Sequence, residues 1–403
     1  MKKITILALC ALIPTLLLAS NKTLIQKGKY LAEAADCYAC HTKDIGKQFG
    51  GGVPFPTPFG IIYSKNISSS KKYGIGSYTY NQFVKAVRKG VTPHGNLYPA
   101  MPFVSFRLIK DEDMKALYAY FMSIKAVNQA NKKDGLKFPF NIRVGMKAWN
   151  ILNYKAIHLS DNQNKSKAYK RGNYLVNSLG HCGACHTPRS FTMGIKDKFH
   201  LQGNLIAGVF APNITPQDLQ AQGWSKSDVT NILKYGYSRK GTVLGHMTPI
   251  TYHSLSRVNN QDLNAIATYL LGDKNNTKKP LIFNGHDKTK PGYVLYVGYC
   301  SACHGIDGQG IKNVAPALAG NGTLDRKRPL NTIYSLVFGI GKTRYSQNDS
   351  FGTMPKFNLN PQELTDLVNY LQATFTPLKT PHSQGQIMKM KKEVVKGHND
   401  AKE

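Results

Sequence analysis

The feature that most constrains this chain is a pentapeptide that occurs three times. Its pattern is Cys-x-x-Cys-His, and the copies read CYACH, CGACH and CSACH. Six of the seven cysteines belong to these copies: Cys37, Cys40, Cys182, Cys185, Cys300 and Cys303. Random placement of seven cysteines and 12 histidines in 403 residues would give well under one match. The repetition therefore indicates one local chemistry that the chain uses three times.

The histidine after each cysteine pair identifies that chemistry. A Cys-x-x-Cys-His sequence is the attachment signature of c-type haem. A thioredoxin-like redox motif or a zinc site would not need a histidine at this place in all three copies. The two thiols are expected to bind one haem edge, and the next imidazole to face the iron. We therefore predict three covalently bound haem c groups, with His41, His186 and His304 as iron ligands.

The first 20 residues are typical of a secretory signal peptide. Two lysines precede an apolar run that ends in small residues near Ala19 and Ser20. Cys10 lies inside this run and is interpreted as an apolar signal residue. Export would place the mature chain in the bacterial periplasm. After residue 20, no apolar stretch approaches the roughly 20 residues that span a bilayer.

The chain is strongly basic, with a formal net charge of +31. Such a charge on an exported protein favours anionic lipid headgroups or an acidic protein partner. Nucleic acid is excluded by the expected compartment. A lysine-rich surface that serves solubility alone is the plainer alternative, and both interpretations stay open at this point.

A methionine beside proline follows each pentapeptide and supplies a candidate second iron ligand. Met101, Met247 and Met354 lie 60, 61 and 50 residues after their motif histidines. A His/Met pair is the usual ligation of an electron-transfer haem and raises its potential. A methionine in the core is the alternative for each. His246 is a rival for Met247, and Met193 lies too close to His186 to reach across a haem.

The repeats predict an all-α fold of three tandem class I-like cytochrome c domains. Each pentapeptide ends a helix-like segment, and each methionine precedes an amphipathic helix with an acidic start. The expected division is a signal peptide at 1–20, domain 1 at 21–125, a connector at 126–168, domain 2 at 169–273, a linker at 274–290, domain 3 at 291–376 and a basic, poorly ordered tail at 377–403. The connector is interpreted as a strap packed on the domains; docking of a partner or a membrane is the alternative.

Iron with two protein ligands leaves no position for a substrate, so the pattern favours electron relay over catalysis. No catalytic residue is assigned, and the chain has no P-loop or dinucleotide-binding fingerprint. Two alternatives stay open. One is a self-sufficient multihaem enzyme of the peroxidase or thiosulfate-oxidising type, and the other is a free soluble electron carrier.

The chain resembles the three-haem cytochrome c subunits of membrane-bound periplasmic dehydrogenases that oxidise gluconate, sorbitol, fructose or, with a quinone cofactor, alcohols. The resemblance rests on stretches such as GGVPFPTPFGIIYSKNIS, YPAMPF, RGNYLVNSLGHCGACHTPRS, APNIT, LKFPFNIR and CSACHGIDGQG. It implies a non-catalytic subunit that passes electrons from a flavoprotein or quinoprotein dehydrogenase to ubiquinone at the outer face of the cytoplasmic membrane. It also implies that Asn66 and Asn213 are haem-pocket residues. Relatives commonly end in an apolar or amphipathic segment, whereas this C-terminus is charged, so contact with anionic membrane would be peripheral.

Overall fold

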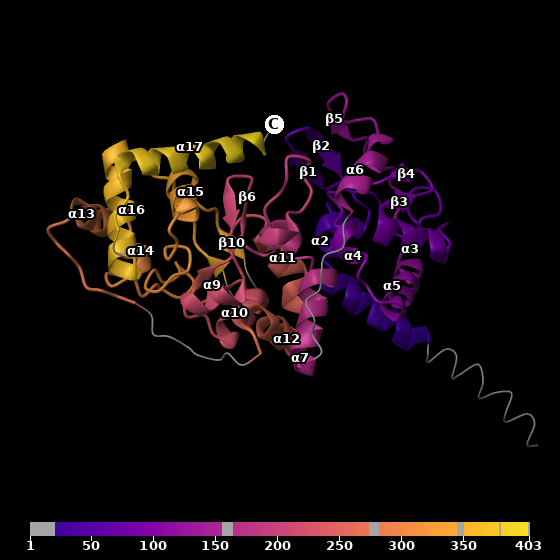
Figure 1. Cartoon of the computed structure of the whole chain (residues 1–403), viewed down its shortest axis with the longest axis horizontal. Helices are drawn as coiled ribbons and strands as arrows, with labels where there is room; N and C mark the ends of the chain where they lie inside the picture. The colour runs from indigo at the N-terminus through magenta and orange to yellow at the C-terminus, as the bar shows by residue number, and fades with distance from the viewer. Residues whose placement is uncertain (1–20, 155–163, 274–281, 345–349, 379, 402–403) are drawn as a thin grey trace, which may run out of the picture. The chain divides into compact units, whose positions relative to one another are not determined.

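The computed structural model describes residues 21–154, 164–273, 282–344, 350–378 and 380–401 (Figure 1). The predicted signal peptide and residues 274–281 of the predicted linker lie outside the described residues. The chain forms two compact units. The first holds most residues up to 156 together with 177–181, and the second holds 157–176 and residues from 182 onward, together with 56–58.

The first unit is mainly helical. Residues 21–34 form its first helix. The elements that follow are α2 (Cys37–His41), the 3-10 turn η1 (Ile45–Lys47), β1 (Pro54–Thr57), β2 (Gly60–Tyr63), α3 (Tyr80–Lys89), β3 (Val91–Thr92), β4 (Gly95–Asn96), α4 (Phe103–Phe106), α5 (Asp111–Ser123), β5 (Gly135–Leu136) and α6 (Gly145–Asn153). The strands are short, and they form a β1-β2-β5 sheet and a β3-β4 hairpin.

The second unit contains the other two pentapeptides. Its elements are α7 (Lys167–Tyr174), the π-helix η2 (Leu175–Leu179), α8 (Gly183–His186), η3 (Asp197–Phe199), β6 (Asn204–Ile206), β7 (Val209–Ala211), α9 (Pro216–Ala221), α10 (Lys226–Tyr235), β8 (Tyr237–Ser238), β9 (Gly241–Thr242), α11 (Met247–His253), η4 (Leu255–Arg257), α12 (Asn260–Leu271), α13 (Pro291–Tyr299), α14 (Ser301–His304), α15 (Leu330–Phe338), β10 (Thr343–Arg344), β11 (Ser350–Phe351), α16 (Pro361–Phe375) and α17 (Gln384–Asp400). In the described part of this unit the strands pair with their neighbours, as β6-β7, β8-β9 and β10-β11. The expectation of a purely all-α fold is therefore too strict, although helices dominate.

One helix crossing recurs three times and places each pentapeptide. The helix before the cysteines carries a glycine that lies against the helix after the methionine. A Cβ atom on these glycines would stand 1.9 to 2.3 Å from a backbone carbonyl oxygen; the pairs are Gly28 with Ala116, Gly172 with Ala265, and Gly292 with Asp366. Any larger side chain would force the two helices apart, because the facing atom is backbone. The crossing fixes where each cysteine pair begins.

The three helices expected after the methionines are present as α5, α12 and α16. Asp111, Asp262 and Glu363 stand in their first turns, where the helix dipole favours negative charge. Asn360 and Glu363 form a capping box at the start of α16. These helices supply most of the buried apolar residues that close each crossing.

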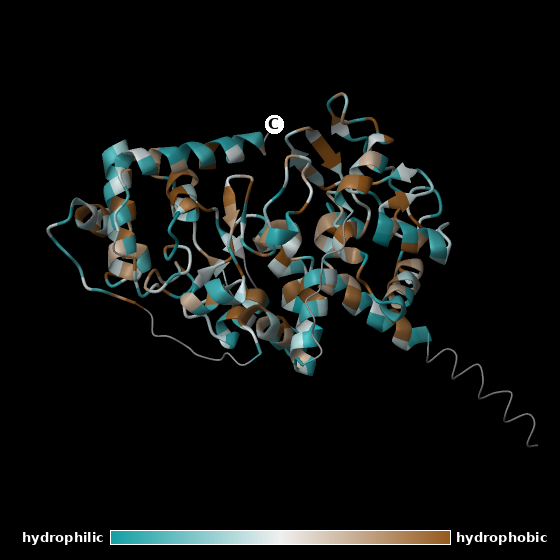
Figure 2. Cartoon of the chain, viewed as in Figure 1, coloured by the Kyte–Doolittle hydropathy of each residue, from teal (hydrophilic) through white to brown (hydrophobic). Residues whose placement is uncertain are grey.

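The C-terminal segment differs from its expected disorder. Residues 384–400 form α17, which contacts α15 and α16 (Figure 1). Ser383 and Gln386 form a capping box that starts the helix. Figure 2 shows that α17 is mostly hydrophilic, yet Ile387, Met390 and Val394 are buried. Their spacing of three and four residues places them on one face, so the basic tail is an amphipathic helix with a packed side.

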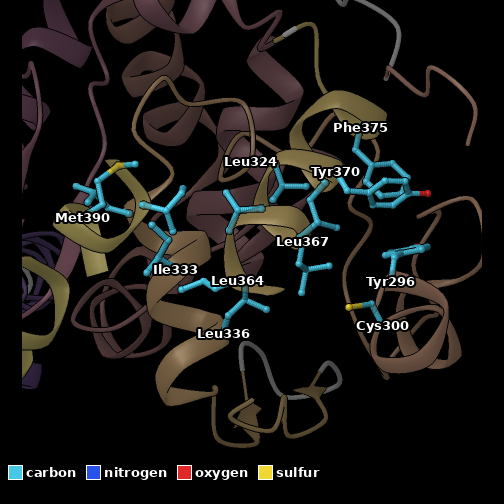
Figure 3. Close-up of a cluster of buried hydrophobic side chains, with 14 of the residues drawn as sticks. Tyr296, Cys300, Leu324, Ile333, Leu336, Leu364, Leu367, Tyr370, Phe375 and Met390 are labelled. Atoms are coloured by element: carbon cyan, nitrogen blue, oxygen red, sulfur yellow. The ribbon is translucent and has the colours of Figure 1, made fainter. Parts of the chain in front are cut away.

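One core of the second unit is built from α13, α15, α16 and α17. Figure 3 shows Tyr296 and Cys300 from the region of α13 near Tyr370 and Phe375 of α16. The Tyr296 and Phe375 rings have centroids 5.4 Å apart. Cys300 thus belongs to the core, and the apolar packing of this part of the unit continues up to the pentapeptide.

The described part of the predicted connector packs on the first unit. Arg143 Nη1 donates to the backbone carbonyl of Asn96 at 3.0 Å, and the Trp149 and Phe103 rings lie 6.2 Å apart. Phe138 and Ile151 are exposed. The interpretation as a packed strap fits residues 126–154, whereas residues 155–163 lie outside the described residues.

Candidate haem-binding sites

Each pentapeptide lies at a short helix that begins at its first cysteine or directly after it, so the second cysteine and the histidine follow the first cysteine by about one turn. The copies form α2, α8 and α14. The six motif cysteines are not paired in disulfides. The backbone N–H of each of His186 and His304 bonds to the carbonyl of its first motif cysteine, at 2.9 Å in both cases. The local fold therefore leaves the thiols available for bonding to a group other than one another.

The three motif histidines are oriented by the same hydrogen bond. Nδ1 of each imidazole lies 2.7 to 2.8 Å from a backbone carbonyl oxygen; the pairs are His41 with Lys65, His186 with Pro212, and His304 with Pro316. Because a carbonyl only accepts, Nδ1 carries the proton and donates. Nε2 is then the acceptor nitrogen, which is the form that binds a metal, and such a bond also fixes the ring orientation.

A second shared contact holds the backbone of each histidine. The carbonyl oxygen of the histidine accepts a hydrogen bond from a glycine N–H downstream; the donors are Gly51 at 2.8 Å, Gly203 at 2.7 Å and Gly310 at 2.7 Å. The histidine is thus fixed at its ring and at its main chain. The three sites match in both contacts although the intervening loops differ in length.

Burial keeps the ligand groups neutral. It lowers the pKa of His41, His186 and His304, and the bond to the carbonyl partly opposes this. The positive charge of Arg326 also lowers the pKa of His186. Burial raises the pKa of the first thiol of each pair, in Cys37, Cys182 and Cys300, to about 12. The imidazoles are therefore ready to bind a cation without first losing a proton.

The donor set fits haem c. Two thiols separated by two residues, followed by an imidazole with a free Nε2, are the groups that this cofactor requires. Cys300 and His304 are buried in the fold. Among the described residues no group of three or more His, Cys, Asp or Glu side chains forms another metal site.

The structure places the predicted methionines at similar points of the chain without testing their bond to iron. Met101 precedes α4, Met247 begins α11, and Met354 bridges to Ile340. All three are partly buried. The rivals are more exposed, since His246 is exposed and Met193 has an exposed fraction of 37%. Ligation by the three methionines stays a prediction.

The sequence singled out Asn66 and Asn213, but it did not predict that the backbone carbonyl oxygens just before them bond to the motif histidines. Asn66 and Asn213 directly follow the residues whose carbonyls accept from the histidines. Their Oδ1 atoms accept the N–H of Ser68 at 3.0 Å and of Thr215 at 2.9 Å, so they stabilise the turn after each acceptor. Their expected place in a haem pocket is not tested by these bonds. The repeated asparagine was the available signal for the acceptor loop.

Comparisons with known proteins agree with this chemistry. A family model described as cytochrome c matches residues 25–125 and 289–375. The gluconate 2-dehydrogenase cytochrome c subunit of Pantoea cypripedii is 37% identical over 88% of this chain and 86% of its own length. The fructose dehydrogenase cytochrome subunit of Gluconobacter japonicus is 35% identical over 89% and 80%. The cytochrome c subunit of the quinone alcohol dehydrogenase of Gluconacetobacter polyoxogenes is 34% identical over 88% and 81%.

Proposed function

Since this chain belongs to the cytochrome c family, among the cytochrome c subunits of dehydrogenases, we propose that it holds three haem c groups and relays electrons from a dehydrogenase. The observation that supports the number three is the repeated bond from histidine Nδ1 to a backbone carbonyl. The family model covers the first and third sites, and the middle site shares their helix crossing and their histidine contacts.

The residues of the chain have distinct tasks in this role. The six cysteines fix the cofactors covalently, and His41, His186 and His304 hold the iron through Nε2. When bound, haem c supplies one-electron iron redox chemistry. The neutral, buried surroundings disfavour the extra charge of oxidised iron, and methionine ligands would add to that effect. Three such sites in one chain would carry electrons across a gap too wide for one.

The partner is proposed to be a separate catalytic subunit with flavin or quinone cofactor, which oxidises a sugar, a sugar acid or an alcohol. The names of the relatives support such a subunit. The proposed acceptor is ubiquinone, and the proposed location is the periplasm at the membrane surface. In the described part of the chain, no helix is long and apolar enough to cross a membrane. The net charge of +31 favours peripheral contact with anionic lipid.

Haem counting and ligand binding test this function. The alkaline pyridine assay on the purified holoprotein should give three haems per chain, and all should be low-spin in the oxidised state. Carbon monoxide should leave the reduced spectrum unchanged, because histidine and methionine ligands would leave no open position on the iron. A count of two or fewer haems per chain would contradict the proposed three-haem relay. A high-spin haem that binds carbon monoxide would favour the self-sufficient enzyme instead.

A further inference from the structure

The segment that carries the hydrogen-bond acceptor of His186 is bonded at both of its ends to residues of the third repeat. His186 donates to the carbonyl of Pro212, which stands between β7 and α9. Two residues before Pro212, both backbone groups of Phe210 pair with the side chain of Asn331. Phe210 N–H donates to Asn331 Oδ1 at 2.7 Å, and Asn331 Nδ2 donates to the Phe210 carbonyl at 2.8 Å.

An ion pair holds the other side of the same segment. Six residues after Pro212, Asp218 of α9 pairs with Arg326, whose Nη1 lies 2.6 Å from Oδ2. The backbone carbonyl of Arg326 in turn accepts from Gln372 Nε2 at 2.7 Å, which ties the arginine to α16. Asn331 lies on α15, and α15 contacts β7 (Figure 1). Residues 210–218 are therefore attached at both ends to the fold around His304.

The matching segment of the first unit is held in another way. Asn66, which follows the acceptor Lys65, donates through Nδ2 to the carbonyl of Val127 at 2.7 Å. Its own N–H donates to Asn131 Oδ1 at 2.6 Å, and Lys65 pairs with Asp134 at 2.7 Å. The residues that follow α5 thus hold the segment around Lys65, whose carbonyl accepts the hydrogen bond of His41. In the second repeat, the corresponding bonds come from Asn331 and Arg326, which belong to the third repeat.

We infer that Asn331 and Arg326 of the third repeat position the iron-ligand histidine of the second repeat. The inference rests on the proposed three-haem function and extends it. The second and third sites are then structurally coupled. Residues of the third repeat fix the position of the Pro212 carbonyl, and this carbonyl orients the His186 ring. A stronger bond at Nδ1 makes the imidazole a better donor to iron and stabilises the oxidised state. The two positioning residues thereby help to set the potential of the second haem.

Two substitutions separate orientation from charge. Asn331→Ala changes no charge but removes both hydrogen bonds to the backbone of Phe210. The bond from His186 Nδ1 to the Pro212 carbonyl should then weaken, and the second haem should become easier to reduce. At a fixed ambient potential its ratio of reduced to oxidised iron should rise about two- to tenfold, as expected for one weakened hydrogen bond. Arg326→Gln removes a cation near His186 and breaks the ion pair with Asp218, so that ratio should fall. Arg326→Lys keeps the charge and should restore most of it.

Arg328→Gln is the matched control. Arg328 is two residues from Arg326, but its side chain pairs with Glu393 of α17 at 2.5 Å rather than with residues 210–218. It should leave all three potentials unchanged. The measurement is a potentiometric titration of the full-length holoprotein, followed optically and by the electron paramagnetic resonance of each oxidised haem. A Cys185→Ala background marks the second haem, because losing one thioether bond shifts or removes its absorption band.

The outcomes distinguish the inference from the function beneath it. Three haems per chain with opposite shifts of the second haem in Asn331→Ala and Arg326→Gln support the inference. An unchanged second haem in both variants, or an equal shift in Arg328→Gln, overturns it while the relay stands. Fewer than three haems in the unmutated protein overturns the proposed function itself. If Asn331→Ala loses haem, Asn331→Ser carries the test, because its shorter side chain also releases Phe210 and should raise the same ratio.

Discussion

Gly292 lies so close to Asp366 that a Cβ atom on the glycine would stand 2.3 Å from the carbonyl oxygen of Asp366. The same atom would lie 2.4 Å from Cβ of Tyr370. Both neighbours belong to α16, and the carbonyl cannot move without disturbing its helix. The absence of a side chain at Gly292 thus decides how near α13 can approach α16, and with it where Cys300 lies in the core.

Gly292→Ala should therefore destabilise the third site. Overpacking a crossing of two helices typically costs about 1–3 kcal/mol. Gly298→Ala is the matched control on the same helix, because a Cβ there has nothing within 4 Å. Alanine at an open helical position should stabilise by roughly 0.5–1 kcal/mol. Thermal unfolding of the two holoproteins measures both effects, and equal melting temperatures would show that the crossing is not tight.

The predicted methionine ligands can be tested one at a time. Leucine has nearly the volume of methionine, so it preserves packing but cannot bind iron. Each of Met101→Leu, Met247→Leu and Met354→Leu should convert one haem to high spin, or to a new low-spin form, and should lower one midpoint potential. Met193→Leu should change none. Near-infrared absorption of the sulfur–iron bond gives the readout, and an unchanged band in Met247→Leu would turn attention to His246.

Asp36 gives the first site a pH-dependent stability. Burial raises its pKa to about 7, and a weak contact with Cys40 at 3.9 Å opposes this. Below pH 3.8, the ordinary value, the carboxyl is protonated in both folded and unfolded chains. Between pH 3.8 and about 7 the unfolded chain releases the proton first, so stability falls as pH rises. The full cost, on the order of 4 kcal/mol, is present above that window.

Asp36→Asn removes this cost because the amide does not ionise. Asparagine also tolerates the left-handed backbone at this position, where φ is 55°. The variant should melt at a higher temperature than the unmutated holoprotein at pH 8 and at nearly the same temperature at pH 3.5. Asp44→Asn makes the same substitution at an exposed site and is the surface control. A constant difference at both pH values would contradict the assigned titration.

The sequence predicts the cysteine and histidine positions because covalent chemistry demands a fixed local spacing. It does not predict the acceptors Lys65 and Pro212, since any residue supplies a carbonyl. The contact of Asn331 with Phe210 is likewise beyond local patterns, because 121 residues separate them. Within the segment 377–403, for which disorder was expected, residues 384–400 form a helix, and the sequence missed this for a different reason. Ile387, Met390 and Val394 had helical spacing behind a Ser383 cap, but the lysines around them dominated the composition.

The packed face of α17 leads to a last prediction about the C-terminal segment. Ile387 is fully buried and belongs to the core that also contains Leu364 and Leu367 of α16. Ile387→Ala removes that packing and should cost about 2–5 kcal/mol, as large-to-small changes in a core do. Lys389→Ala is the control, since its side chain is exposed on the same helix and alanine favours helix formation.

Thermal unfolding and limited proteolysis of the holoprotein measure the consequence. Ile387→Ala should release α17 from α15 and α16 and make residues 384–400 the first site of cleavage. Lys389→Ala should be cut no faster than the unmutated protein. Because α17 also contacts β7, next to the segment that holds His186, its release should reach the second site as well as the third. Cleavage at equal rates in both variants would mean that the helix contributes little to the stability of this unit.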